Sequence, residues 1–314
     1  MTYARMTRPS VHTDEDLRAR ASEALAQLRR VDGTAAELVA PYLALQATWP
    51  AGTSYLEVPR AVRATLDSLG ARGGQPLVAA FHRAVLLFAM VTTRPVLRAH
   101  PVWPDSLALW DEAMDRVLNR LSKRSAADLD YPNDLWAKDI ALATGRLWHA
   151  GAQLIQPRMG LSRRLLLQGG APTFLRGITM LLMMGGHYPL YEMHTASHTL
   201  RYFSPGGWAE CYRRIARALA RDPEAKGVFG TAWFFDPALE RVSPHLVYLR
   251  QFPLERGAVF LKVETTEGSR RDAVANSFPR RALYEAGKYD PQDYLMIWPR
   301  RAMLAWLSQI QVAT

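Results

Sequence analysis

The fold of the second half of the chain depends on one apolar and aromatic segment. It reads Lys226-Gly227-Val228-Phe229-Gly230-Thr231-Ala232-Trp233-Phe234-Phe235-Asp236-Pro237. A run of this composition that ends in Asp-Pro is typical of a buried central strand followed by a turn. We therefore expect a sheet in this half, with residues 227–235 near its centre.

The segments around this strand predict further strands and helices. β-prone runs bounded by Gly, Pro or Asp lie at Tyr188–Thr195, His245–Gln251, Ala258–Glu264 and Tyr294–Trp298. Helical spacing covers Trp208–Ala220 and about Arg271–Glu285. The order is strand, helix, strand, strand, strand, helix, strand. It predicts a mixed α/β unit whose middle strands are neighbouring and antiparallel.

The first half of the chain predicts helices instead. Thr13 lies three residues before Asp16, the spacing of a capping box, and an apolar stripe with helical period follows. The same period recurs at 77–90, 107–121 and 135–154. We predict an α+β protein in which an N-terminal all-helical half, residues 1–157, precedes an α/β half, residues 158–314, that holds the active site.

Composition excludes several classes of protein. The chain has 314 residues and one cysteine, so a disulfide scaffold is impossible. It contains neither the G-x-G-x-x-G nor the G-x-x-x-x-G-K-[ST] phosphate motif. The first residues have no apolar signal region, and the most apolar window, 77–91, contains His82 and Arg83. We expect a cytoplasmic protein without a membrane span, and the sequence does not determine its oligomeric state.

The net charge of +10 comes mostly from arginine, because only five of the 39 basic residues are lysine. A basic protein can bind nucleic acid, an anionic cofactor or nothing specific. The chain has no nucleic-acid-binding motif, so we expect a small-molecule substrate rather than nucleic acid as its partner.

The densest group of polar residues lies between His187 and His198. Glu192, His194 and His198 share one face of the chain if the segment is a strand, and the two histidines lie one turn apart if it is a helix. Imidazole and carboxylate groups in this arrangement are typical of acid–base catalysis.

The same histidines also fit a metal site. Imidazole is the commonest metal ligand in proteins. His187, His194 and His198, with Asp236 or His245 as a distant further ligand, therefore predict as an alternative an iron or haem centre. Under this hypothesis the protein is a metal- or haem-dependent oxygenase of small-molecule metabolism.

A segment near the C-terminus resembles a known family. It reads Asp272-Ala273-Val274-Ala275-Asn276-Ser277-Phe278-Pro279-Arg280-Arg281-Ala282-Leu283-Tyr284-Glu285-Ala286-Gly287-Lys288-Tyr289. This resembles the last helix–strand unit of the GCN5-related N-acetyltransferases, in which an Asn precedes a Tyr-Glu-x-Gly run. The resemblance implies an acyl-CoA cofactor, with Asn276 beside the pantetheine arm and Tyr284 as the acid that protonates the leaving thiolate.

In that family an anion-binding loop would follow the predicted strand His245–Gln251, and its motif is not found in this chain. The chain there reads Pro253-Leu254-Glu255-Arg256-Gly257-Ala258. Arg250 and Arg256 flank this position, and guanidinium groups suit phosphate and carboxylate. We therefore expect these two arginines to contact the cofactor.

Three hypotheses for function follow. The first is an acyltransferase-like enzyme that transfers an acyl group to a small amine, with Glu192, His194 or His198 as the base. The second is the oxygenase described above. The third is a non-catalytic binding or regulatory protein that uses its arginine-rich face.

Overall fold

The computed structural model describes residues 12–312 except 51, 122, 126, 130 and 132. The chain forms two compact units, Met1–Ala150 and Gly151–Thr314. The first consists almost entirely of helices and the second combines a mixed sheet with helices, so the fold class is α+β, as predicted. The predicted boundary at residues 157/158 stays a prediction.

The elements of the first unit are α1 (Asp14–Val31), α2 (Gly33–Glu37), α3 (Val39–Ala47), α4 (Arg60–Ala99), α5 (Ser106–Leu121), η1 (Ala127–Leu129), α6 (Asp134–Ala143) and β1 (Trp148–His149). The capping box at Thr13 and Asp16 is confirmed, since each residue binds the backbone N–H of the other. The apolar stripe that follows is buried. The helix predicted for 135–154 ends at Ala143 instead.

The long helix α4 forms the centre of the first unit. It is kinked at Gly74, whose φ of +63° lies in the left-handed region, and Pro76 lies two residues further along. By length and composition alone α4 could cross a membrane, and 61% of its most apolar window is buried within the structure. A core helix passes the same test. Phe81 and Met90, for example, have no exposed surface.

The elements of the second unit are β2 (Leu154–Met159), α7 (Arg163–Leu167), α8 (Gly170–Met183), β3 (Leu190–His194), η2 (Ser197–Tyr202), α9 (Pro205–Arg221), β4 (Gly227–Ala232), η3 (Trp233–Phe235), α10 (Leu239–Val242), η4 (Pro244–Leu246), α11 (Tyr248–Leu254), β5 (Val259–Lys262), α12 (Glu267–Ala275), α13 (Phe278–Glu285), β6 (Tyr294–Pro299) and α14 (Arg300–Val312). The strands of this unit lie in the order β2-β3-β4-β6-β5.

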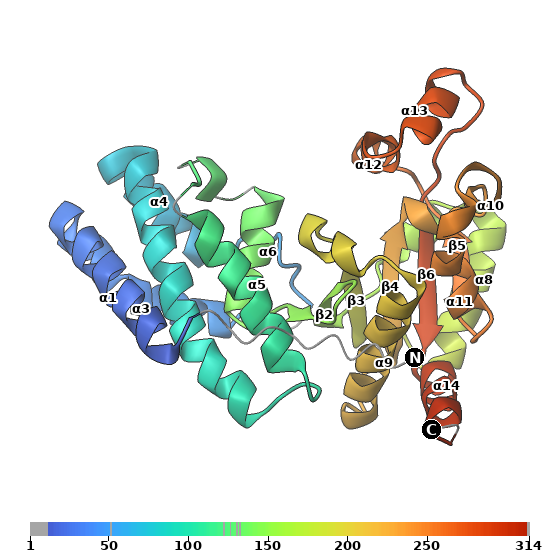
Figure 1. The fold of residues 1–314 in the computed structure, drawn as a ribbon, viewed down its shortest axis with the longest axis horizontal. Coiled ribbons are helices and arrows are strands. Elements are labelled where there is room, and N and C mark those ends of the chain that lie inside the picture. Colours follow the sequence, from blue (N-terminus) through green and yellow to red (C-terminus); the bar gives the residue numbers. More distant parts are fainter. Residues whose placement is uncertain are drawn as a thin grey trace. The chain divides into compact units, whose positions relative to one another are not determined.

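One pair of strands in this sheet is parallel. β3 and β4 run in the same direction and are joined by α9, whereas β2–β3, β4–β6 and β6–β5 are antiparallel. The carboxyl ends of β3 and β4 therefore lie at the same end of the sheet, where β6 begins and β5 ends. Figure 1 shows α12 and α13 beyond the end of the sheet where β6 begins.

The two faces of the sheet have different coverings. On one face, Leu190, Phe229 and Ile297 form a buried cluster with residues of α7 and α8. On the other face, Tyr212 of α9 packs edge-on against Trp298 and stacks on Phe252 of α11. The sheet is thus covered on both sides, and its strands read as nearly continuous apolar runs.

The structure corrects two of the predicted elements. The predicted strand His245–Gln251 is helical, because η4 and α11 occupy it. The predicted helix Arg271–Glu285 is two helices, since α12 ends at Asn276 and Ser277 caps α13 through a bond from the N–H of Arg280. The strands predicted at 188–195, 258–264 and 294–298 are confirmed as β3, β5 and β6. The strand predicted at 227–235 is confirmed as β4 only to Ala232, because residues 233–235 form η3.

Candidate functional site

The candidate site lies at the carboxyl ends of β3 and β4. The ladder between these parallel strands contains the pairs Tyr191–Val228 and Glu192–Phe229. Both strands then continue, β3 to His194 and β4 to Ala232, without further pairs in the ladder. Ligands of open α/β sheets bind at such an edge, and an extended ligand can pair with strand backbone there.

Glu192 and His194 lie on the same face of β3. The distance between Glu192 Oε2 and His194 Nε2 is 3.7 Å, and 27% and 13% of the two side chains are exposed. Glu192 pairs in register with Phe229, and Thr231, two residues further along β4, is exposed. The sheet face is therefore open to solvent beside this carboxylate.

The environment of Glu192 favours the protonated carboxyl group. Burial raises its pKa from 4.5 to about 7. A carboxylate with a pKa near neutrality can accept a proton from a substrate and release it again. Glu192 and His194 lie together in the structure, as the sequence predicts. Their catalytic role stays a prediction.

The other residues of the histidine group are spread along the chain. His198 lies on η2 just beyond β3, and only 9% of it is exposed. His187 lies before β3, at the opposite end of the strand from His194. An extended strand advances about 3.3 Å per residue, so the predicted set of His187, His194 and His198 is not brought together.

Asp236, the fourth proposed metal ligand, is held in a turn. Its Oδ1 accepts a hydrogen bond from the N–H of Ala238, and its Oδ2 accepts one from the N–H of Gln292. Among the described residues, no group of three or more His, Cys, Asp or Glu side chains has the arrangement of a metal site.

The N-terminus of α9 lies next to this edge of the sheet. Ser204 caps the helix by accepting the N–H of Gly207, and Pro205 occupies the first turn. A side chain at Gly207 would meet the carbonyl oxygen of Tyr202 at 2.1 Å, whereas Gly206 has open space around its Cα. Backbone N–H groups at a helix N-terminus attract phosphate groups.

The sequence predicted a helix at Trp208–Ala220 but gave no function to the preceding residues, Ser204-Pro205-Gly206-Gly207. It sought the anion-binding loop after residues 245–251 instead, where the motif is not found, and residues 248–254 form the helix α11. Gly206 and Gly207 lie between β3 and α9, and α9 leads to β4, which is parallel to β3. The position of these two glycines is the feature of the sequence that could have indicated an anion site here.

A cavity of about 500 Å³ lies beyond the carboxyl end of β4. It is formed by η3, α10, η4 and α11, and its lining includes Phe234, Asp236, Leu246 and Arg250. The guanidinium of Arg250 stacks on Phe260 and Tyr294 and donates to the carbonyl of Phe235. Its orientation is therefore fixed at the cavity wall, where it can bind an anionic group.

The remaining predicted cofactor and acid residues lie elsewhere. Arg256 stacks on Phe252 and donates to its carbonyl. Asn276 is the C-cap of α12. Tyr284 lies on α13 with 36% of its surface exposed, within the insertion between β5 and β6. Neither Asn276 nor Tyr284 lies on the helix that connects β3 with β4, and their predicted roles stay predictions.

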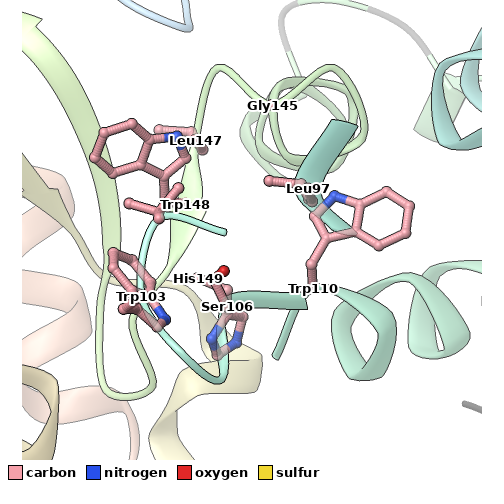
Figure 2. Close-up of a pocket in the computed structure, with 9 residues that line it drawn as sticks. Leu97, Trp103, Ser106, Trp110, Gly145, Leu147, Trp148 and His149 are labelled. Carbon is pink, nitrogen blue, oxygen red and sulfur yellow. The ribbon is translucent and has the colours of Figure 1, made fainter. Parts of the chain in front are cut away.

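The first unit contains a much smaller cavity. Figure 2 shows it between Trp103, Ser106, Trp110 and His149. Its volume of about 10 Å³ is that of about one water molecule. This cavity is too small for a substrate.

Known proteins resemble the chain in fold. A solved acyltransferase in complex with CoA and 10C-teicoplanin matches with a TM-score of 0.51 and 14% identity, covering 93% of this chain and 89% of that one. A mutant acyltransferase in complex with octanoyl-CoA matches with a TM-score of 0.48, 14% identity and the same coverage. No protein-family model and no curated protein sequence matches the chain. The chain therefore has the fold of an acyltransferase.

Proposed function

We propose that the chain is an acyltransferase that transfers an acyl group from acyl-CoA to an amine, and that it works in the cytoplasm. The observation that carries this proposal is the placement of Glu192, with a pKa of about 7, at the last pair of the ladder between β3 and β4, on a sheet face that becomes exposed to solvent at Thr231. The acyltransferase fold supports the same assignment.

The cofactor would be held by three features of the second unit. The N–H groups that begin α9 would bind its phosphates, and Arg250 would bind a further anionic group at the wall of the 500 Å³ cavity. Backbone groups of β3 and β4 beyond the pair Glu192–Phe229 would pair with the amide groups of an extended arm. Acyl-CoA would supply the thioester carbonyl that the amine attacks.

Glu192 would act as the base. It accepts a proton from the amine nitrogen as the bond from nitrogen to the acyl carbon forms and the carbon–sulfur bond breaks, and the departing thiolate takes up a proton. His194, 3.7 Å away, would position the Glu192 carboxylate. The enzyme then returns to its starting state when Glu192 releases its proton to solvent.

The direct test is release of free coenzyme A thiol. The purified protein is incubated with acetyl-, octanoyl- or decanoyl-CoA and a panel of primary amines, and the acylated product is identified by mass spectrometry. Because the neighbour was solved with 10C-teicoplanin, teicoplanin belongs in the panel. Thiol release that requires both substrates supports the proposal. Absence of release with every pair, together with no thermal stabilisation by CoA, contradicts it.

A further inference from the structure

We propose that Arg146, in the helical unit, forms a binding site for an oxyanion, either a carboxylate or a phosphate group carried by a small molecule. This site is independent of the proposed acyl transfer. The guanidinium carbon of Arg146 lies 3.3 Å from the centre of the Trp49 ring, so the planar group is stacked and oriented. One donor, Nη2, makes a long hydrogen bond of 3.4 Å to the carbonyl of Ser54.

The position of Arg146 is fixed by the end of α6. Gly145, with φ of +74°, ends the helix, and the N–H groups of Arg146 and Leu147 both donate to the carbonyl of Ala141. On the other side, the loop that carries Ser54 is held by a hydrogen bond from Tyr55 to Asp134. The guanidinium therefore sits between two anchored segments.

The charge of Arg146 is not neutralised by the described part of the chain. No carboxylate there forms an ion pair with it, and its Nη1 is buried without a hydrogen-bond partner. Asp134 is engaged with Tyr55 and with Lys138, whose Nζ lies 2.7 Å from its Oδ2. Burial lowers the pKa of Arg146 to about 10.

Other arginines of the same unit form ion pairs with carboxylates. Arg94 forms ion pairs with Asp111 and Asp14, and the hydrogen bonds that Arg94 donates to Asp111 raise the pKa of Arg94. Arg124 pairs with Asp139. An isolated buried cation is costly, and a guanidinium with unused donors binds oxyanions in a bidentate manner. The nearby Nε1 of Trp49, buried and without a partner, offers a further donor for the same anion.

The test compares thermal unfolding in sodium chloride, acetate and inorganic phosphate at equal ionic strength. We expect the midpoint of the wild-type protein to rise by roughly 3–6 °C when the bound anion reaches about ten times its dissociation constant. A rise with acetate alone identifies a carboxylate, and a rise with phosphate alone identifies a phosphate group. A rise with neither overturns the proposal.

Variants separate binding from a purely structural role. Arg146→Met should lose the anion response and unfold, in chloride, at a midpoint no lower than that of the wild type, because an uncompensated buried charge is removed. Arg98→Met serves as the control, since Arg98 lies in the same unit, is 52% exposed and pairs with Asp14. It should keep the anion response. If Arg146→Met retains the response, or Arg98→Met loses it equally, the site is not at Arg146 and the proposal is wrong.

Discussion

The carboxylate of Glu192 lies 3.7 Å from the imidazole of His194, on adjacent same-face positions of one strand. Two residues apart on a strand is the spacing that brings side chains to the same face. The surrounding apolar sheet withdraws the carboxylate from water, which raises its pKa to about 7. The Glu192 carboxyl group therefore titrates near neutral pH.

Replacing Glu192 tests its role as the base. Glu192→Gln preserves the shape of the side chain but cannot accept a proton, so we expect kcat for acyl transfer to fall by about 10²–10⁴-fold, the usual contribution of a general base. Glu224→Gln is the matched control, because Glu224 is an exposed residue of the same unit that forms an ion pair with Arg158. Unchanged activity in Glu192→Gln would remove this residue from the mechanism.

The pH dependence follows from the same group. A base must be ionised to act, so kcat/KM of the wild type should rise with pH and level off above about pH 7, the pKa of Glu192. Glu192→Gln should lack this rise. A wild-type profile that is flat between pH 5.5 and 8.5 would contradict the assignment.

Stability should show the opposite dependence on pH. Because the pKa of Glu192 is raised in the folded state, the folded protein binds more protons than the unfolded chain between pH 4.5 and about 7. The contribution of Glu192 to the free energy of unfolding therefore falls as the pH rises through this range. Glu192→Gln should therefore be more stable than the wild type at pH 8, by at most ~3 kcal/mol, and similar at pH 4.5. Urea unfolding at the two pH values measures the difference.

Two neighbouring glycines at the start of α9 should respond differently to alanine. A methyl group at Gly207 would lie 2.1 Å from the backbone oxygen of Tyr202, while one at Gly206 meets no atom within 4 Å. Gly207→Ala should displace the first turn of α9, lower the unfolding midpoint and weaken CoA binding. Gly206→Ala should fold normally. Calorimetric titration with CoA checks both, and equal behaviour of the two variants would argue against this geometry.

Arg280 holds α12 and α13 to the rest of the second unit. It is 6% exposed, donates to the carbonyl of Ala273 and the hydroxyl of Ser243, and lies over the Trp233 ring. Arg280→Ala should increase hydrogen exchange across 264–292 while β2 and β3 stay protected. Arg281→Ala, at the exposed neighbouring position, should change exchange little. Unchanged exchange in Arg280→Ala would show that other contacts hold the two helices.

Local errors in the sequence reading have identifiable tertiary causes. The segment 245–251 is rich in residues that favour strands, yet it is helical because Phe252 of α11 stacks on Tyr212 beneath the sheet. The break between α12 and α13 had a local signal, since Ser277 and Pro279 are a helix cap and a first-turn proline. The prediction of one continuous helix at about Arg271–Glu285 did not take this cap and proline into account.

The sequence by itself determined the α+β class, the helical first half and most strands of the sheet, because hydrophobic period and capping residues act over a few neighbours. It also placed Glu192 beside His194, because alternation along a strand is a local property. Only the tertiary structure decided that β3 and β4 are parallel neighbours whose ladder stops at Glu192, and that the helix between them begins at Ser204-Pro205-Gly206-Gly207. Strand pairing joins residues about 37 positions apart, which no local pattern encodes. The sequence likewise gave no sign that Arg146 lies over Trp49 without an ion-pair partner among the described residues, since this depends on which carboxylates the fold brings near.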